Sequence, residues 1–240
     1  MDGIVGMKPP SLRQALKSLA IVRKAYYSWN CSNKHRAELL VSNRAVFERI
    51  YAENSWQCDE TRSGSGSTLA ETEIVRAELP KLLARIGAKS MLDAACGDCH
   101  WISRVELGIE YTGVDVVPSL IDQNRCRFPG RRFLAADLAS DSLPCVDLIL
   151  CRDCLFHLSY RQMRKILRNF RRSGSRYLLT TTFPSLTENY NIVSGGWRPL
   201  NLELPPFSLP SPLELWCENN PGYPDKSLGL WRVEVLSCLS

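Results

Sequence analysis

The stretch Met91-Leu-Asp-Ala-Ala-Cys-Gly-Asp-Cys-His100 decides the fold of this chain. It begins as an apolar strand that ends at the acidic Asp93, and a tight turn of small residues follows. From Trp101 onward the pattern predicts a helical segment. A strand, a tight turn and a helix in this order let the backbone approach a nucleotide closely, so we expect a parallel α/β sheet with a ligand at its carboxyl edge.

Two more acidic residues end predicted strands. Asp115 lies 22 residues after Asp93, near the offset of about 20 residues at which an acidic side chain accepts hydrogen bonds from ribose hydroxyls. Asp137 ends a third strand and is followed by Leu138. A parallel strand can end in Asp without binding a ligand, but three such ends predict one crevice at the carboxyl edge of a doubly wound sheet.

The rest of the chain supports this fold class. From residue 70 onward helical and strand patterns alternate, as a parallel sheet with crossover helices requires. The predicted strands are 90–96, 110–116, 132–136, 146–151, 176–183 and 228–235. Helices are expected over 160–171 and from near Leu69, where Thr68 is a candidate cap and Glu71 follows three residues later. We therefore predict an α/β, Rossmann-like, mostly parallel sheet with an N-terminal helical arm.

The domain organisation follows from composition. Residues 1–66 are expected to form a basic helical arm and lid, with helices over 11–29 and 35–52, and residues 67–240 the catalytic domain. The Pro- and Asn-rich stretch 184–225 is too long for an ordinary connection and is expected to be an insertion on the substrate side. Residues 1–50 hold nine Lys and Arg against three Asp and Glu, which gives them a charge of +6. The rest of the chain carries −1, and the net charge is +5. That charge fits either a solvated helix face or an anionic partner or membrane surface.

The cellular location is also predicted from composition. No run approaches the ~18 apolar residues of a membrane span, and no signal peptide pattern is visible. Without an export signal, the ten cysteines indicate thiols in a reducing compartment. We expect a cytoplasmic protein with peripheral contact to the inner membrane through the basic N-terminal helix.

At this point a resemblance becomes visible. Leu-Asp-Ala-Ala-Cys-Gly-Asp98, Gly-Val-Asp115 and Ala-Asp137-Leu resemble the first three motifs of class I S-adenosylmethionine-dependent methyltransferases. The resemblance implies S-adenosyl-L-methionine as the cofactor, with Asp93 and Gly97 at its amino-acid end, Asp115 on the ribose and Asp137 with Leu138 at the adenine. The predicted cofactor-binding residues are Asp93, Ala95, Gly97, Asp98, Asp115, Asp137, Leu138 and Arg152.

The turn departs from the family pattern at two positions. The first and third glycines of the family are Ala95 and Cys99 here. Their Cβ atoms crowd the turn, but they also argue against a dinucleotide enzyme, whose pyrophosphate requires all the glycines. S-adenosyl-L-methionine has no phosphate to bind.

The segment Asp147-Leu-Ile-Leu-Cys-Arg-Asp-Cys-Leu-Phe-His157 carries the candidate catalytic residues. It reads as the fourth strand and its loop, at the edge that faces the transferable methyl group in this fold. His157 suits the removal of an acceptor proton, or is a packed histidine, and Asp153 could orient it or act as the base itself. Arg152 could hold the cofactor carboxylate or an acidic substrate group.

Cysteines occur in two Cys-x-x-Cys pairs, Cys96 with Cys99 and Cys151 with Cys154. Two such pairs ordinarily indicate zinc, but four converging thiolates would fill the pocket that the motifs assign to the cofactor. We interpret them as wall residues and expect no metal.

The acceptor is suggested by a second resemblance. The runs Cys-Arg-Asp-Cys154, Trp197-Arg-Pro-Leu-Asn-Leu-Glu203 and Asp225-Lys-Ser-Leu-Gly-Leu-Trp231 are similar to a bacterial methyltransferase subfamily that includes a rhizobial nodulation protein. It implies O-methylation of a sugar hydroxyl, such as the 2-OH of fucose on a nodulation lipo-chitooligosaccharide. The residues predicted to bind this small-molecule or glycan acceptor are Trp101, Trp197, Arg198 and Asn201, although buried aromatic residues can equally be core.

Two other functions stay open at this stage. One is methylation of nucleic acid or protein, which the basic arm would assist. No basic patch interleaved with aromatic residues lies beyond that arm, and no Asn/Asp-Pro-Pro-Tyr motif is present, so no nucleic acid partner is expected. The other is a noncatalytic module that binds the cofactor without chemistry.

Overall fold

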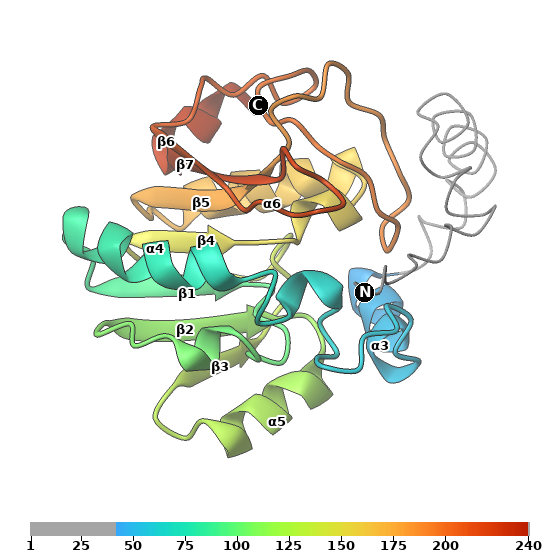
Figure 1. The fold of residues 1–240 in the computed structure, drawn as a ribbon, viewed down its shortest axis with the longest axis vertical. Helices are drawn as coiled ribbons and strands as arrows, with labels where there is room; N and C mark the ends of the chain where they lie inside the picture. The colour runs from blue at the N-terminus through green and yellow to red at the C-terminus, as the bar shows by residue number, and fades with distance from the viewer. Residues whose placement is uncertain (1–41, 240) are drawn as a thin grey trace, which may run out of the picture.

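The computed structural model describes residues 42–239. These residues form a central sheet with helices on both faces (Figure 1). The helix predicted over 11–29 and the first part of the one over 35–52 lie outside the described residues. The later part of the second prediction is present as α3, Asn43–Ala52.

The sheet has seven strands in the order β3-β2-β1-β4-β5-β7-β6. Their bounds are β1 Ser90–Ala94, β2 Glu110–Asp115, β3 Arg132–Ala135, β4 Leu148–Cys151, β5 Tyr177–Thr182, β6 Glu214–Cys217 and β7 Ser227–Arg232. β7 runs antiparallel to β5 and β6, and the other neighbouring pairs are parallel. The prediction of a doubly wound, mostly parallel sheet is confirmed. Strand order reverses between β1 and β4, the point at which ligands bind in open α/β sheets.

Two features of the C-terminal part differ from the prediction. β6 was not expected, because its four residues follow a Pro-rich stretch and pair only with β7 at the sheet edge. The strand predicted over 228–235 ends at Arg232, where a 3-10 helix, Val233–Leu239, begins. The segment 184–225, predicted as a substrate-side insertion, contributes buried residues to the core: Leu200, Leu202, Phe207 and Leu209.

The remaining helices are α4 Glu73–Arg85, α5 Pro118–Arg127 and α6 Tyr160–Arg172. The helix predicted from near Leu69 begins four residues later, at Glu73. Thr68 Oγ1 accepts a hydrogen bond from the Glu71 amide at 3.3 Å. This bond lies in a turn that precedes α4, so Thr68 does not cap the helix. The segment after Trp101 forms only a 3-10 turn, Ile102–Arg104, so the α-helix predicted there is wrong.

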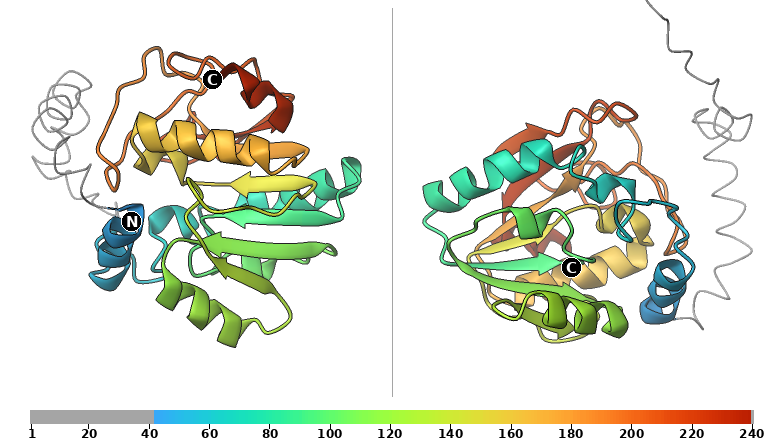
Figure 2. Two further views of the ribbon diagram at one scale, coloured as in Figure 1. Left: turned by 180° about the vertical axis from the view of Figure 1, so that it is seen from behind. Right: turned by 60° about the horizontal axis from the view of Figure 1, so that its bottom comes forward.

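Alternation along the buried strands divides the core between the two faces of the sheet. In β1, Leu92 packs on the face that α6 covers, and Met91 packs on the face that α4 covers. The two helices lie on opposite faces of the sheet (Figures 1 and 2). Among the described helices, none is long and apolar enough to cross a membrane.

We expect Gly229→Ala to destabilise the protein. A Cβ at Gly229 would lie 2.3 Å from the ring of Trp231, which is 1% exposed and donates from Nε1 to Pro210 O at 2.7 Å. Because the ring is packed on all sides, the free energy of unfolding should fall by roughly 1 to 3 kcal/mol. Urea unfolding measures this change. Gly130→Ala is the control, since a Cβ there meets nothing within 4 Å, and an equal loss in both variants would contradict the prediction.

Candidate active site

A crevice lies at the carboxyl edge of the sheet, where strand order reverses. This first crevice encloses about 1020 Å³ of empty space, its open mouth included, and α3 contributes to its wall. Its wall contains most of the predicted cofactor and catalytic residues: Asp93, Ala95, Gly97, Asp115, Asp137, Leu138, Arg152, Asp153 and His157.

The turn after β1 keeps a glycine-like backbone. Ala95, Gly97 and Cys99 all have positive φ, of 66°, 55° and 56°. Ala95 and Cys99 replace the family's glycines, so the left-handed conformation is retained at a cost of roughly 1 to 2 kcal/mol for each side chain. The turn leads into a 3-10 turn and not into a long helix, and therefore provides no α-helix N-terminus for a pyrophosphate.

Two carboxylates of the first crevice are held in place by hydrogen bonds. Asp115 accepts from the amides of Gly97 and Val117, each at 3.1 Å, and burial raises the pKa of its carboxyl despite these bonds. Asp93 accepts from Tyr111 Oη at 2.7 Å. Burial raises the pKa of Asp93 to about 6, although the Tyr111 hydrogen bond opposes this rise.

Asp98 has a different role from the one predicted. It does not line the first crevice, and its carboxylate accepts from Thr61 Oγ1 at 2.8 Å, Ser63 Oγ at 2.9 Å and the Arg62 amide at 3.0 Å. These bonds hold the loop 61–67 against the turn, where a Cβ on Gly97 would meet Ser63 Oγ at 2.1 Å. We call this loop the lid, because Arg62, Ser63 and Ser67 form part of the crevice wall.

A second crevice joins the first. The two share Trp56, Ser63, Asp153 and His157. The second is rich in aromatic side chains from separate parts of the chain: Trp56, Phe156, Phe183, Trp197 and Tyr223. Trp197 and Tyr223 have ring centroids 4.6 Å apart. A ligand in each crevice would therefore meet at the shared residues.

His157 occupies this junction with a defined tautomer. Its Nδ1 lies 2.7 Å from Gly196 O, and because a carbonyl only accepts, Nδ1 carries the proton. Burial lowers the pKa of His157 to about 4, although the Gly196 contact opposes this shift. The imidazole is thus neutral at physiological pH. Among the described residues no group hydrogen-bonds Nε2, so its lone pair can accept a proton.

Asp153 lies beside His157 in both crevices. Its Oδ2 accepts from Lys226 Nζ at 2.7 Å, and Thr181 Oγ1 lies 3.1 Å from its Oδ1. Burial opposes ionisation, but Arg152 and Lys226 outweigh it and lower the pKa of Asp153. Asp153 is therefore an ionised carboxylate. The Nδ1 partner that orients His157 is Gly196 O, so the orienting role predicted for Asp153 is wrong.

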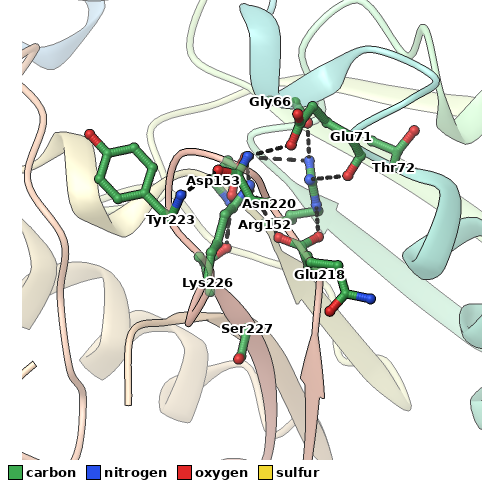
Figure 3. Close-up of polar contacts among 12 residues, drawn as sticks. Gly66, Glu71, Thr72, Arg152, Asp153, Glu218, Asn220, Tyr223, Lys226 and Ser227 are labelled. Carbon is green, nitrogen blue, oxygen red and sulfur yellow. Dashed lines mark hydrogen bonds and ion pairs between the residues drawn. The ribbon is translucent and has the colours of Figure 1, made fainter. Parts of the chain in front are cut away.

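Asp153 belongs to a buried network of four charges (Figure 3). Arg152 Nε donates to Glu218 Oε1 at 2.6 Å, and Lys226 Nζ lies 3.1 Å from Glu218 Oε2. Arg152, Glu218 and Lys226 are each 5 to 6% exposed. The network joins the end of β4 to the ends of β6 and β7.

The same network holds the lid. Arg152 Nη1 donates to Gly66 O at 2.7 Å and Nη2 to Glu71 O at 3.3 Å. Arg152 does line the first crevice, but its guanidinium is occupied by these acceptors and by Glu218. The structure therefore gives it a positioning role in place of the cofactor-carboxylate role predicted from the sequence.

The predicted acceptor residues separate into two groups. Trp197 lines the second crevice, and Trp101 lines the first, where the Arg152 guanidinium lies 5.7 Å from its ring. Arg198 and Asn201 line neither crevice. Arg198 is 0% exposed and donates to Phe156 O at 2.9 Å, and Asn201 donates to Pro184 O and Leu186 O. Both stabilise the 184–204 segment, which corrects the substrate-binding role predicted for them.

Sequence reasoning missed Glu218, Lys226 and Tyr223. Lys226 directly precedes the apolar run of β7, and such a position is the only local sign that it is buried. Glu218 and Tyr223 carry no local signal, because their roles depend on partners distant in the chain.

The cysteine pairs line or lie behind the crevice walls. Cys96 and Cys154 contact the first crevice, whereas Cys99 and Cys151 are buried behind it. Burial raises the pKa of Cys96 well above its usual range. Within residues 42–239 no group of three or more His, Cys, Asp or Glu side chains is arranged to hold a metal ion.

Comparison with known proteins agrees with this geometry. A family model described as a methyltransferase domain matches residues 91–174, which run from Met91 in β1 to the end of α6 and include Asp153 and His157 of the junction. Residues 91–174 are therefore similar in sequence to methyltransferase domains. S-adenosyl-L-methionine is the methyl donor of this domain family, as the sequence predicts. Among curated proteins, none matches the sequence.

Solved structures share the fold of this domain. The N-methyltransferase NodS from Bradyrhizobium japonicum WM9, in complex with S-adenosyl-L-homocysteine, has a TM-score of 0.58 at 17% identity, over 76% of this chain and 97% of NodS. The 1,6-didemethyltoxoflavin-N1-methyltransferase from Burkholderia thailandensis has a TM-score of 0.58 at 21% identity, over 83% of this chain and 89% of that enzyme. The chain also spans 56% of a protein from Pyrococcus horikoshii OT3, with a TM-score of 0.41. At these identities the likeness concerns the fold.

We expect Glu218→Ala to destabilise the protein strongly. The substitution leaves the buried Arg152 and Lys226 without one of their two carboxylates, and breaking a buried ion pair costs about 3 to 5 kcal/mol. Thermal and urea unfolding measure the loss. Glu214→Ala is the matched control, four residues earlier at the start of β6, because Glu214 pairs with Arg85 at the surface and such pairs contribute about 0 to 1 kcal/mol. A loss below 1 kcal/mol for Glu218→Ala would contradict the importance of the network.

Proposed function

We propose that this protein transfers the methyl group of S-adenosyl-L-methionine to a hydroxyl of a carbohydrate acceptor. The observation that carries the proposal is the position of His157, whose unprotonated Nε2 lies at the junction of two crevices. One crevice suits the cofactor and the other a ring with apolar faces and polar edges. The fucose of a nodulation lipo-chitooligosaccharide is the first acceptor to test.

The first crevice fits the cofactor. The Asp115 carboxylate is fixed by two backbone amides at the end of β2, so it can accept hydrogen bonds from ribose hydroxyls. Leu120, Leu138, Leu158 and Ile166 give the Asp137 side an apolar wall for an adenine ring. Asp93 lies in the wall near Gly97 and is suited to the cofactor's amino group. The lack of a long helix after the turn also favours a ligand without a pyrophosphate.

The second crevice suits a sugar ring. Trp56, Trp197 and Tyr223 offer ring faces on which the apolar faces of a pyranose can pack. Asp153, Lys226 and Asn220 provide polar atoms for hydroxyl groups in the same crevice. Asp153 is ionised, so it can accept a hydrogen bond from a hydroxyl next to the one that is methylated.

When bound, S-adenosyl-L-methionine supplies a methyl group that its sulfonium already activates. The protein must place the acceptor oxygen and remove its proton. We propose that His157 Nε2 accepts the proton of the acceptor hydroxyl. Gly196 O then stabilises the imidazolium that forms, because it accepts a hydrogen bond from Nδ1. The lid and α3 exclude water from the first crevice.

We predict that Asp115→Ala weakens cofactor binding. The loss of hydrogen bonds between the carboxylate and the ribose should cost about 1.5 to 3 kcal/mol. Isothermal titration calorimetry with S-adenosyl-L-homocysteine measures this loss. Asp122→Ala is the control, since Asp122 pairs with Arg125 on the exposed side of α5 and lies outside the crevice wall. Equal affinity of wild type and Asp115→Ala would contradict the assigned site.

We predict that His157→Ala lowers turnover by roughly 100-fold or more and leaves S-adenosyl-L-homocysteine binding intact. Methyl transfer to a fucosylated lipo-chitooligosaccharide, followed by mass spectrometry, measures turnover. His100→Ala is the matched control, because His100 contacts Glu60 and lines neither crevice. Full activity of His157→Ala would exclude it as the base and favour a noncatalytic role for this residue.

The same histidine makes a prediction about pH. Because its pKa is lowered to about 4, His157 should stay neutral, with the proton on Nδ1, from pH 8 down to about pH 5. Two-bond ¹H–¹⁵N correlation spectra report the tautomer and the titration, and His157→Gln assigns the signals. Protonation near pH 6.5 would contradict the buried geometry.

Transfer of methyl groups to RNA or protein, with none to sugars, would replace the carbohydrate proposal.

A further inference from the structure

Helix α6 carries an unusual charge pattern. Its thirteen residues include six basic side chains and no acidic one. We call these the basic face of α6: Arg161, Arg164, Lys165, Arg168, Arg171 and Arg172. The helix therefore contributes +6 to a chain whose net charge is only +5.

This pattern does not favour the stability of the helix. Arg161 lies in the first turn, where a basic residue opposes the helix dipole and no acidic residue offsets it, although Arg171 and Arg172 in the last turn suit the dipole. Arg161 lies three and four positions before Arg164 and Lys165, and such like-charge pairs destabilise a helix by roughly 0.2 to 0.5 kcal/mol each. An anionic partner would remove this repulsion.

Five of the six charges also lack partners within the described residues. Residues 42–239 provide no ion pair or side-chain hydrogen bond to five of them: Arg161, Arg164, Lys165, Arg171 and Arg172. Asp141 lies beside α6, since its carbonyl accepts from Asn169 Nδ2, but its carboxylate accepts from the Asp137 amide.

The position of α6 makes this face available beside the active site. Met163, Ile166 and Phe170 are 0 to 2% exposed. The apolar side of α6 is therefore buried in the core and cannot insert into the apolar interior of a membrane. Figure 2 (left) shows the helix along the outside of the sheet, with no described element in front of it. Its N-terminus follows His157 by three residues, so the face begins next to the junction of the two crevices.

We propose that the basic face of α6 docks this protein on a membrane surface that contains anionic phospholipids. A row of cations along a straight helix can contact the anionic headgroups of a flat membrane surface. Each Lys or Arg near such a surface contributes about 1 kcal/mol to membrane binding. The face carries no exposed aromatic side chain for stacking on bases, which favours lipid phosphates over single-stranded nucleic acid. Docking would hold the crevices at the interface, where a lipid-linked acceptor is found. The inference does not rest on the identity of the acceptor.

Vesicle sedimentation with the full chain tests this proposal. The variant Arg161→Gln/Arg164→Gln/Lys165→Gln removes three charges from the face. The control variant Lys89→Gln/Arg104→Gln/Arg132→Gln removes three exposed charges that lie outside α6, two of them at the amino edge of the sheet. Thermal unfolding midpoints establish that both variants are folded. The N-terminal 41 residues are identical in all three proteins, so their charge cannot explain a difference.

We expect wild type and the control variant to bind vesicles of phosphatidylcholine with phosphatidylglycerol, and not vesicles of phosphatidylcholine alone. The α6 variant should bind roughly 10- to 100-fold more weakly, and added salt should weaken wild-type binding. Unchanged binding of the α6 variant would overturn the proposal and assign binding to another segment. Binding of an RNA oligonucleotide that depends on the α6 charges, without binding to vesicles, would also overturn it.

Discussion

The active site depends on one buried group of charges, in which Arg152 and Lys226 are neutralised by Glu218 and Asp153. Burying a charge is costly unless it is paired and hydrogen-bonded, so each of these four side chains needs the others in place. Arg152 also donates hydrogen bonds to the carbonyl groups of Gly66 and Glu71. One network therefore fixes three parts of the wall at once: the end of β4, the lid, and the β6–β7 hairpin that carries Tyr223.

The clustering of the acidic strand ends in the first crevice could be predicted from the sequence because its determinants are local. Asp115 and Asp137 follow strands whose apolar residues are contiguous, and the carboxyl ends of parallel strands meet at one edge. The junction could be predicted only in part. His157 follows β4 directly, but the partner that sets its tautomer, Gly196, lies 39 residues away and is brought near by the packing of the 184–204 segment.

The errors of prediction have the same origin. Arg152, Arg198 and Asn201 look like ligand-binding residues in the sequence, since Arg and Asn commonly bind anions and hydroxyls. Each instead satisfies carbonyl or carboxylate groups of distant segments inside the protein. Asp98 was misjudged because its motif position suggests the cofactor, whereas the lid that it holds comes from residues 61–63. The partners of long polar side chains are set by the tertiary fold. A local sequence pattern does not contain this information, because the partners come from distant parts of the chain.

The reversed strand has a consequence for biogenesis. β7 lies inside the sheet between β5 and β6, yet it is the last strand along the chain. While the ribosome is still making residues 183–226, β5 is paired with β4 on one side and presents an unpaired edge on the other. Until residue 218 is made, Arg152 also lacks Glu218, its buried carboxylate partner. The nascent chain thus passes through a stage with an open sheet edge and with an Arg152 whose charge only the adjacent Asp153 balances.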